Sequence, residues 1–546
     1  HSFPTRRSSD LTLLDSNEGY VSGTETMDIG VGRLPVKSQS EAQLVLDKIL
    51  NYTSTATFGD WRNVLTFVGD DAEDVTSHQT QTDYLANVCD TLVPNYNIDK
   101  IYLDAFQQVS TPVGARYPDV NIAILNRIKK GTLIFNYTGH GNELGLAHEH
   151  VVTSSDIASW DNWNKLPLFI TATCEFSRYD DPVRTSAGEQ VLLNHKGGGI
   201  GLFSTSRLVY STPNFYLNQS FYDYMFAQNE NGETYRLGDV MRLAKNSGTT
   251  GSSINKRNFV FLGDPALQIA IPYYDVITTH INGTTLSLAT DTFKALSKVT
   301  VSGKIVDKAG SLVSNFNGII YPAVYDKPMF TSTRGNDGNA PLNYKIQNKI
   351  LYKGKATVKN GEFTFTFIVP KDISYTIGKG KISYYADNSQ LDAAGNYRDV
   401  MIGGSSSNYL SDSISPDLKL YMNDENFVFG GITDPNPKMI ASIIDSSGIN
   451  TVGNGIGHDI TAVLDGNTSK AINLNDYYEA ELDSYQKGKV SYDFTNLTVG
   501  NPNLKLKVWD VNNNSAEAYL EFIVANSADL VLEHIFNYPN PVTTHT

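Results

Sequence analysis

Two short apolar segments, TLIFNYTG at residues 132–139 and LPLFITAT at residues 166–173, constrain the fold more than any other feature of the sequence. Both consist mainly of leucine, β-branched and aromatic residues, and glycine or proline stands at or near the start of each, which is typical of buried strands. Helical and loop-like sequence fills the interval between them. We therefore predict two neighbouring parallel strands joined by crossover connections.

Each predicted strand ends at a residue with catalytic potential, because His140 follows the first and Cys174 follows the second. The carboxyl ends of parallel strands open on one edge of a sheet, where ligands bind, so the imidazole and the thiol are predicted to meet there. A neighbouring imidazole lowers the pKa of a thiol from about 8.5 and later protonates the leaving amine. The pair predicts a cysteine peptidase-like site, with Cys174 as nucleophile and His140 as base.

Other groups are expected to complete this site. The main-chain N–H groups of Gly141 and Cys174 are the predicted oxyanion hole. Asp70 and Asp71, at the end of a third predicted strand, are candidates for orienting His140, and they would equally suit a helix-capping or solvated pair. Three nearby glutamates stay unassigned, namely Glu143, Glu149 and Glu175.

The remaining histidine and cysteine residues have simpler interpretations. His148, Glu149 and His150 are consecutive, whereas a helical zinc motif needs histidines one turn apart, so we predict no metal site and place them on the substrate cleft or the surface. Cys89 shares a helical spacing with Leu85 and Leu92 and is predicted to be core. We expect no cofactor and leave open a structural calcium ion.

Charge and hydropathy exclude two classes of partner. The net charge of −15 and the sequence pI near 5.1 provide no basic footprint for phosphates, so no nucleic-acid partner is expected. The sequence also has no apolar run long enough for a transmembrane helix. These properties leave the enzyme, binding and scaffold classes open.

The order of the predicted elements divides the chain of 546 residues into an α/β part and an all-β part. Helix and strand patterns alternate over residues 38–273, which predicts a doubly wound α/β domain with a mostly parallel sheet. After about residue 272 the sequence is rich in Val, Ile, Tyr, Thr and turn residues. Two all-β, immunoglobulin-like sandwich domains are predicted, over residues 275–403 and 417–525.

Several motifs resemble the gingipain family of cysteine peptidases over about residues 30–272. They are NYTGHG, TATCEF, GEQVLLN and FLGDPALQIAIP. The longer stretch TATCEFSRYDDPVRTSAGE, together with TSRLVY, is most similar to the subfamily that acts as sortase of the type IX secretion system. The resemblance implies a caspase-like fold, with Cys174 and His140 as the catalytic pair.

The same resemblance implies a function, partners and a location. The enzyme would remove C-terminal sorting domains from secreted cargo and transfer the cargo to an amine of cell-surface lipopolysaccharide. Its partners would include other type IX secretion components, and it would lie at the cell surface, on the exterior of the outer membrane of a Gram-negative bacterium. The alternatives are a degradative gingipain-like endopeptidase secreted by the same route, and a catalytically inactive surface adhesin or scaffold.

The two ends of the sequence are predicted to lie outside these domains. Residues 1–11 resemble translated sequencing-adapter sequence, and residues 12–37 are interpreted as the remnant of a preceding subdomain. NYPNPV, within residues 527–546, resembles the start of a truncated C-terminal sorting-type domain.

Overall fold

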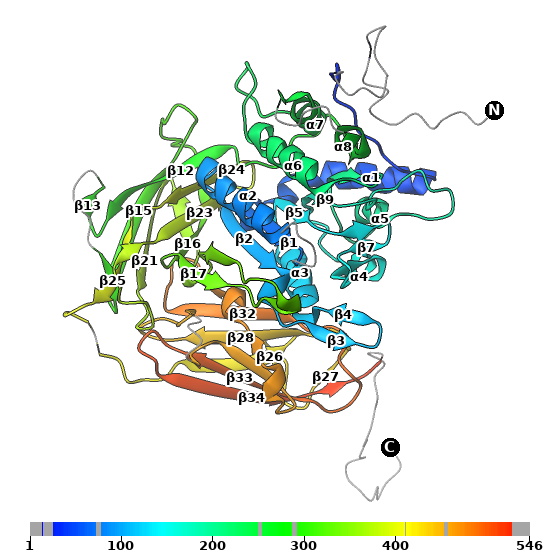
Figure 1. The fold of residues 1–546 in the computed structure, drawn as a ribbon. Coiled ribbons are helices and arrows are strands. Elements are labelled where there is room, and N and C mark those ends of the chain that lie inside the picture. Colours follow the sequence, from blue (N-terminus) through cyan, green and yellow to red (C-terminus); the bar gives the residue numbers. More distant parts are fainter. Residues whose placement is uncertain are drawn as a thin grey trace, which may run out of the picture.

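The computed structural model describes Leu14 and residues 26–71, 78–248, 254–286, 292–409, 411–452 and 457–526. The predicted adapter sequence at residues 1–11 and the predicted sorting-type segment at residues 527–546 lie outside this part of the chain. In Figure 1 the α/β domain packs against two β units, one formed by the green to yellow strands and one by the orange to red strands.

The central sheet of the α/β domain has six strands in the order β11-β10-β9-β5-β1-β2. Five of them run parallel, and β11 is antiparallel to its neighbour β10, which confirms the predicted mostly parallel sheet. The strands are β1 (Val64–Gly69), β2 (Asn97–Tyr102), β5 (Ile134–Thr138), β9 (Leu168–Ala172), β10 (Gly201–Thr205) and β11 (Phe259–Leu262).

Helices cover both faces of this sheet, as expected for a doubly wound domain. The described helices of the domain are α1 (Gln39–Tyr52), α2 (His78–Leu92), α3 (Pro118–Lys130), α4 (Ser154–Ser159), α5 (Ala187–Leu193), α6 (Ser211–Met225), α7 (Leu237–Asn246) and α8 (Ile254–Asn258). One core cluster packs α2, α6 and α7 on the sheet, and the other packs α3, α4 and α5. Cys89 of α2 is fully buried in the first cluster, as predicted, and burial raises its pKa.

Local sequence explains how the helices next to the site begin and end. Helix α3 begins with Pro118, whose fixed φ suits a first turn, and ends at Gly131, which has a φ of 88°. Helix α5 begins with a capping box in which Ser186 and Glu189 exchange hydrogen bonds. Both helices therefore return the chain to the sheet at fixed points, just before β5 and between β9 and β10.

The first β unit is built around one large sheet. The pairing order β12-β15-β21-β20-β16-β23-β24 returns to its start because β24 also pairs with β12. These strands are β12 (Tyr274–Ile281), β15 (Lys298–Val306), β16 (Gly318–Tyr325), β20 (Ala356–Lys359), β21 (Glu362–Ile368), β23 (Lys381–Asp387) and β24 (Asp392–Tyr397). The hairpin of β17 (Met329–Ser332) and β18 (Asn343–Ile346) projects from it, and β19 (Ile350–Lys353) pairs with β16.

A small sheet closes the first β unit, formed by β14 (Phe293–Ala295), β22 (Gly378–Lys379) and β25 (Met401–Ser405). Strand β25 continues to Ser405, past the predicted domain end at residue 403, because it pairs with both other strands. The immunoglobulin-like assignment of this unit stays a prediction.

The second β unit has two four-stranded sheets, which are β26-β28-β32-β31 and β30-β29-β33-β34. The strands are β26 (Asp417–Met422), β28 (Lys438–Ile444), β29 (Thr461–Leu464), β30 (Ile472–Asn473), β31 (Tyr478–Ala480), β32 (Lys487–Asp493), β33 (Asn503–Trp509) and β34 (Ser515–Glu521). Alternate residues of β28 and β33, such as Ala441 and Leu506, are buried in one common core.

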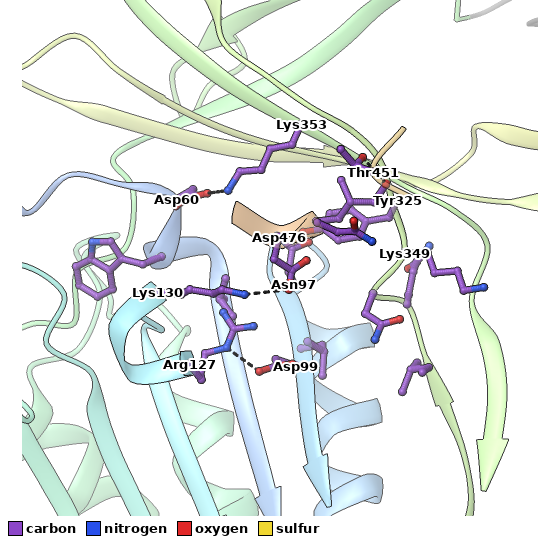
Figure 2. Close-up of a pocket in the computed structure, with 18 of the residues that line it drawn as sticks. Asp60, Asn97, Asp99, Arg127, Lys130, Tyr325, Lys349, Lys353, Thr451 and Asp476 are labelled. Atoms are coloured by element: carbon purple, nitrogen blue, oxygen red, sulfur yellow. Dashed lines mark hydrogen bonds and ion pairs between the residues drawn. The ribbon is translucent and has the colours of Figure 1, made fainter. Parts of the chain in front are cut away.

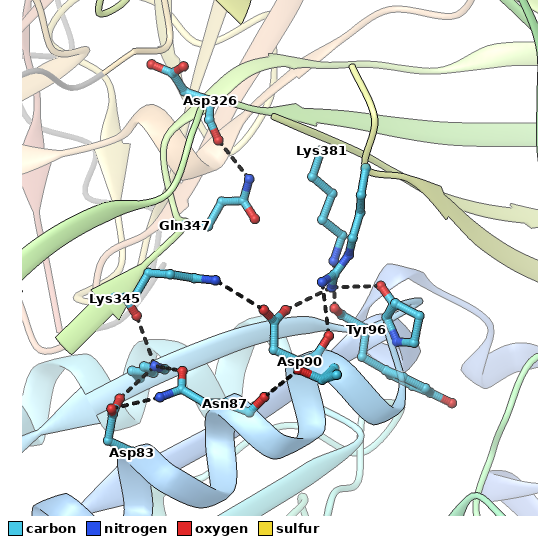
Figure 3. A network of polar contacts seen from close by, with 12 residues as sticks. Asp83, Asn87, Asp90, Tyr96, Asp326, Lys345, Gln347 and Lys381 are labelled. Carbon is cyan, nitrogen blue, oxygen red and sulfur yellow. Dashed lines mark hydrogen bonds and ion pairs between the residues drawn. The ribbon is translucent and has the colours of Figure 1, made fainter. Parts of the chain in front are cut away.

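Polar contacts join the α/β domain to the first β unit. Arg62 pairs with Asp392 at 2.8 Å, and both side chains are almost fully buried. Figure 3 shows a second group, in which Lys381 Nζ donates to the carbonyl oxygen of Tyr96 at 2.6 Å. Since buried charges need such partners, these contacts fix the two units relative to one another. Among the described residues, no helix is sufficiently long and apolar to cross a membrane.

Candidate active site

The parallel pairing of β5 with β9 sets His140 and Cys174 just beyond two adjacent strand ends, at one edge of the sheet. The register joins Ile134 to Leu168 and Thr138 to Ala172. His140 and Cys174 each lie two residues beyond these paired ends. The main-chain N–H of Gly139 donates to the carbonyl oxygen of Ala172 at 3.3 Å and so extends the contact between the two strands.

Cys174 lies on a tight turn that packs against the segment after β10. Its half-buried thiol donates to the carbonyl oxygen of Val209 at 3.6 Å. Glu175, the next residue, has a φ of 52° in the left-handed region, and its N–H donates to the carbonyl oxygen of Arg207 at 3.4 Å. Such strained residues gather at functional turns, and here the strain accompanies an accessible thiol.

His140 is held through its main chain by the end of β1. Its N–H donates to Oδ2 of Asp70 at 2.6 Å. Its carbonyl oxygen accepts from the hydroxyl of Tyr137 at 2.7 Å and from the N–H of Ala147 at 2.9 Å. The backbone of His140 is therefore fixed on both sides of the ring.

Two further histidines contact the ring of His140. His148 stacks on it, with ring centroids 4.6 Å apart and an interplanar angle of 15°. His78, at the start of α2, meets it edge-on at 5.1 Å. Neither contact could be predicted from residue spacing. His148 lies in an irregular loop, and His78 belongs to α2, in a different crossover connection. His148 is exposed, and its predicted place at the substrate cleft or on the surface stays a prediction.

The two glycines of Gly139-His140-Gly141 make room for side chains of neighbouring strand ends. A Cβ atom on Gly139 would lie 2.2 Å from Cβ of Asp70, and one on Gly141 would lie 2.6 Å from Oγ1 of Thr173. Gly141 consequently packs against the residue that precedes the nucleophile. The oxyanion hole expected from the N–H groups of Gly141 and Cys174 stays a prediction.

The two aspartates predicted to orient His140 have different partners. Asp70 contacts the main chain of His140, whereas Asp71 accepts a hydrogen bond from the hydroxyl of Tyr117 at 2.9 Å. Burial raises the pKa of Asp70 well above its ordinary value, and the charges of Asp71 and Glu149 act in the same direction. A protonated Asp70 still accepts the N–H of His140, so its positioning role does not require a negative charge.

Glu149 lies close to Asp70 and Asp71, and the sequence did not indicate this proximity. Asp70, Asp71 and Glu149 are all buried, and each offers an oxygen atom within 4.8 Å of the others. Oxygen donors of this type suit a hard cation, and the sequence leaves a structural calcium ion open without assigning it to any residues. His150 is exposed, with a φ of 59°.

Residues 3–270 match the model of peptidase family C25. Latent PorU from Porphyromonas gingivalis is a solved structure similar to the chain, with 25% identity, a TM-score of 0.32, and coverage of 95% of this chain and 43% of that one. The chain thus spans less than half the length of that protein.

The Arg-specific cysteine proteinase gingipain R shows 15% identity and a TM-score of 0.40, with 73% of this chain and 79% of that chain covered. The complex of Porphyromonas gingivalis RgpB pro- and mature domains shows 14% identity and a TM-score of 0.39, with 73% and 81% covered. No curated protein matches the chain.

Proposed function

Through residues 3–270 the chain belongs to peptidase family C25, and we propose that it is a cysteine endopeptidase in which Cys174 is the nucleophile and His140 the general base and acid. The observation that carries this proposal is the register of β5 and β9, which sets both residues equally far beyond adjacent strand ends. The family supports a cysteine peptidase, and the residue roles are our proposal.

The proposed reaction proceeds through an acyl-enzyme. His140 takes the proton of the Cys174 thiol, and the thiolate attacks the carbonyl carbon of the scissile peptide bond. The main-chain N–H groups of Gly141 and Cys174 stabilise the resulting oxyanion. His140 then protonates the leaving amine, the C–N bond breaks, and the acyl group remains on sulfur as a thioester. Attack by water or by an amine, which loses its proton to His140, releases the acyl group.

We further propose that the acceptor is an amine and that the enzyme is a sortase. In this function it removes C-terminal sorting domains from type IX secretion cargo and transfers the cargo to cell-surface lipopolysaccharide, on the exterior of the outer membrane. The resemblance of residues 171–189 and 205–210 to this subfamily supports the proposal. A caspase-like core and partnership with other type IX components belong to the same proposal.

The surroundings of Cys174 favour a substrate without a basic residue at the cleavage point. Three nearby carboxylates already hold arginine partners: Glu143 with Arg184 at 2.8 Å, Glu175 with Arg178 at 3.5 Å, and Asp180 with Arg207. Beside Val209, which accepts from the thiol, Leu208 and Tyr210 are 68% and 71% exposed. An apolar wall of this kind suits sequence-selective processing better than the Arg- or Lys-directed degradation of the alternative.

The decisive experiment incubates the protein with a cargo that bears its sorting domain, with and without an amine acceptor such as a glycine peptide. The variants are Cys174→Ala and His140→Ala, and Cys89→Ala is the matched control because that cysteine lies in the core. Mass spectrometry measures the loss of the sorting domain and the formation of the amide-linked product.

We expect amide-linked product from the wild type and from Cys89→Ala, and none from the two site variants. Rapid cleavage of generic Arg or Lys peptides, without transfer to the amine, would instead identify a degradative endopeptidase. If Cys174→Ala processed cargo as the wild type does, the catalytic proposal would be wrong and the scaffold alternative would gain support.

A further inference from the structure

Three aspartate side chains converge where the segment between β25 and β26 meets the second β unit. Asp412 lies in that segment, Asp445 directly follows β28, and Asp510 directly follows β33. One carboxylate oxygen from each of them lies within 4.8 Å of the other two. These residues form the aspartate trio, which lies outside the α/β domain and is therefore separate from the candidate active site.

Two members of the trio are removed from water. Asp510 is fully buried and Asp445 is only 5% exposed, whereas Asp412 is half-buried. Burial raises the pKa of both buried carboxyls, and the charge of a neighbouring member of the trio acts in the same direction on each. The hydrogen bonds that they accept oppose this shift. Since buried carboxylates are costly unless an opposite charge or a metal ion compensates them, the trio is a candidate cation site.

The protein itself supplies no counter-charge to the trio. Within the described part of the chain, no lysine, arginine or histidine forms an ion pair with any of its members. A polar cavity of about 620 Å³ where the α/β domain meets both β units, the junction cavity, shows the contrast (Figure 2). Each acid of its lining holds one base: Asp99 with Arg127 at 2.7 Å, Asp476 with Lys130 at 2.9 Å, and Asp60 with Lys353 at 3.1 Å. Those acids are 26–58% exposed, so the more deeply buried trio is the one without bases.

Asp445 has an acceptor oxygen that the described protein does not use. All three of its hydrogen bonds end at Oδ1, which accepts from the N–H and the hydroxyl of Ser447 at 2.8 and 2.7 Å and from the N–H of Gly448 at 3.1 Å. Oδ2 accepts none from the described residues. An unused oxygen on a buried carboxylate, beside two further carboxylates, is favourable only with a bound cation or a proton.

The donor atoms of the trio indicate which cation it would bind. Carboxylate oxygens select a hard cation, and the trio contains no thiol or imidazole that would favour zinc or copper. Calcium takes six to eight oxygen ligands at about 2.3–2.6 Å, so two ligands of one ion lie at most about 5 Å apart. The spacing of the trio therefore allows all three carboxylates to bind a single ion. Calcium also tolerates irregular geometry, which suits ligands from three separate segments better than the strict octahedron of magnesium does.

The turn that carries Asp510 also connects the two β units. Asn514 Nδ2 donates to the carbonyl oxygen of Asp412 at 3.1 Å and to Oδ2 of Asp510 at 2.6 Å, which joins the segment before β26 to the turn after β33. The same turn reaches the first β unit, because the carbonyl oxygen of Val511 accepts from the N–H of Lys371 at 2.9 Å. A cation at the trio would therefore stabilise the attachment of the two β units to one another.

We propose that Asp412, Asp445 and Asp510 form a calcium site, in which Oδ2 of Asp445 is one ligand and water completes the coordination at the half-exposed side of Asp412. The bound ion compensates the charge of the trio and fastens the segment between the β units to two turns of the second unit. The site is independent of the peptidase proposal, since none of its residues belongs to the α/β domain.

Isothermal titration calorimetry of the whole protein, freed of metal ions with a chelator, tests the proposal with calcium chloride at neutral pH, and magnesium chloride is the comparison ligand. The variants are Asp445→Asn, Asp412→Asn and the double variant, because asparagine keeps an oxygen acceptor and removes the charge. Asp417→Asn is the matched control, since this aspartate of β26 is exposed and lies outside the trio. Thermal melting with and without calcium follows the folding and stability of each variant.

We expect saturable calcium binding by the wild type and by Asp417→Asn, with a melting temperature that rises with the calcium concentration. In the double variant one calcium site should be lost or weakened at least about tenfold, and calcium should no longer raise the melting temperature.

Absence of saturable calcium binding to the wild type would overturn the proposal and indicate that protons compensate the trio. Equal calcium binding by the folded double variant would place the site elsewhere on the chain, and equal affinity for magnesium would refute the choice of calcium. If the double variant does not fold, Asp412→Asn decides the question, because this half-exposed side chain can be replaced without disturbing the core.

Discussion

At the scale of single residues, Asp70 acts on the site through the main chain of His140. Its Oδ2 accepts the His140 N–H at 2.6 Å, and Gly139 leaves the space in which it packs. Burial raises the pKa of Asp70, and the charges of Asp71 and Glu149 act in the same direction. The hydrogen bond that positions the proposed catalytic histidine requires only an oxygen acceptor and no negative charge.

Replacement of Asp70 tests its hydrogen bond to the His140 N–H separately from its charge. Asp70→Asn keeps an oxygen that accepts the His140 N–H and should retain most of the activity. Asp70→Ala leaves this donor without a partner at a cost of about 1–3 kcal/mol, so kcat/KM should fall roughly 10- to 100-fold. Steady-state kinetics on a peptide substrate measures the effect, and equal activity of the Ala and wild-type proteins would contradict the role.

The exposed side chains of Leu208 and Tyr210 are predicted to contribute to substrate specificity. Tyr210→Ala removes an aromatic side chain next to Val209, whose carbonyl oxygen accepts from the Cys174 thiol, without affecting the core, because Tyr210 is 71% exposed. We expect kcat/KM to fall about tenfold for substrates with an apolar residue before the scissile bond, which corresponds to about 1.4 kcal/mol. Cleavage of a peptide library compares the variant with Tyr216→Ala, an exposed tyrosine of α6. An equal loss for all substrates would argue against a role in specificity.

At the scale of elements, the short helix α8 fixes the segment that contacts Cys174. Asn255 Nδ2 donates to the carbonyl oxygen of Tyr210 at 2.8 Å, and Asn258 Nδ2 donates to that of Leu208 at 2.7 Å. The thiol of Cys174 donates to the carbonyl oxygen of Val209 between them. The apolar wall is therefore held by its backbone, which leaves its side chains available to a substrate.

Substitution in α8 should consequently alter catalysis from a distance. Asn255→Ala removes the hydrogen bond from Asn255 Nδ2 to the Tyr210 carbonyl oxygen and the one that Asn255 Oδ1 accepts from the Tyr210 N–H at 3.2 Å. The segment should then become mobile, and KM should rise about three- to tenfold, with a smaller change in kcat. Lys256→Ala, on the same helix, is the matched control and should be neutral. Kinetics and melting temperatures distinguish local loosening from unfolding. A loss of kcat with unchanged KM would place Asn255 in another role.

At the scale of the whole molecule, buried polar groups hold the domains together. Lys381 is 3% exposed between the α/β domain and the first β unit, and its Nζ donates to the carbonyl oxygen of Tyr96. Burial lowers the pKa of this lysine to about 7, and the neighbouring Arg398 acts in the same direction. The stability of the junction is therefore expected to depend on pH above neutrality.

The sign of the pH effect follows from proton uptake on unfolding. Above pH 7 the folded protein has lost the Lys381 proton, whereas the unfolded chain keeps it up to about pH 10.5. Rising pH thus favours the folded state through this window, by at most about 1.4 kcal/mol per pH unit. In Lys381→Met the free energy of unfolding should rise less between pH 7.5 and 9.5 than it does in the wild type. Urea titrations compare it with the exposed Lys379→Met, and equal slopes for both variants would refute the prediction.

Much of the fold was predictable from local sequence. Apolar periodicity located the six-strand α/β domain and the core position of Cys89, because burial leaves a regular pattern in each strand and helix. The closed pairing path of the first β unit was not predictable, since it depends on β24 meeting β12 far away in the chain. Strand pairing over such distances leaves no periodic signal in either strand.

The sequence by itself determined that His140 and Cys174 follow two buried strands, because strand length and strand ends are local properties. Only the tertiary structure decided the partner of each group: the acceptor of the His140 N–H, the imidazole stacked on its ring, the wall beside the thiol, and the junction cavity. These contacts join residues from different crossovers and domains. Their geometry depends on strand register and on loop packing, which arise only when all the segments are buried together.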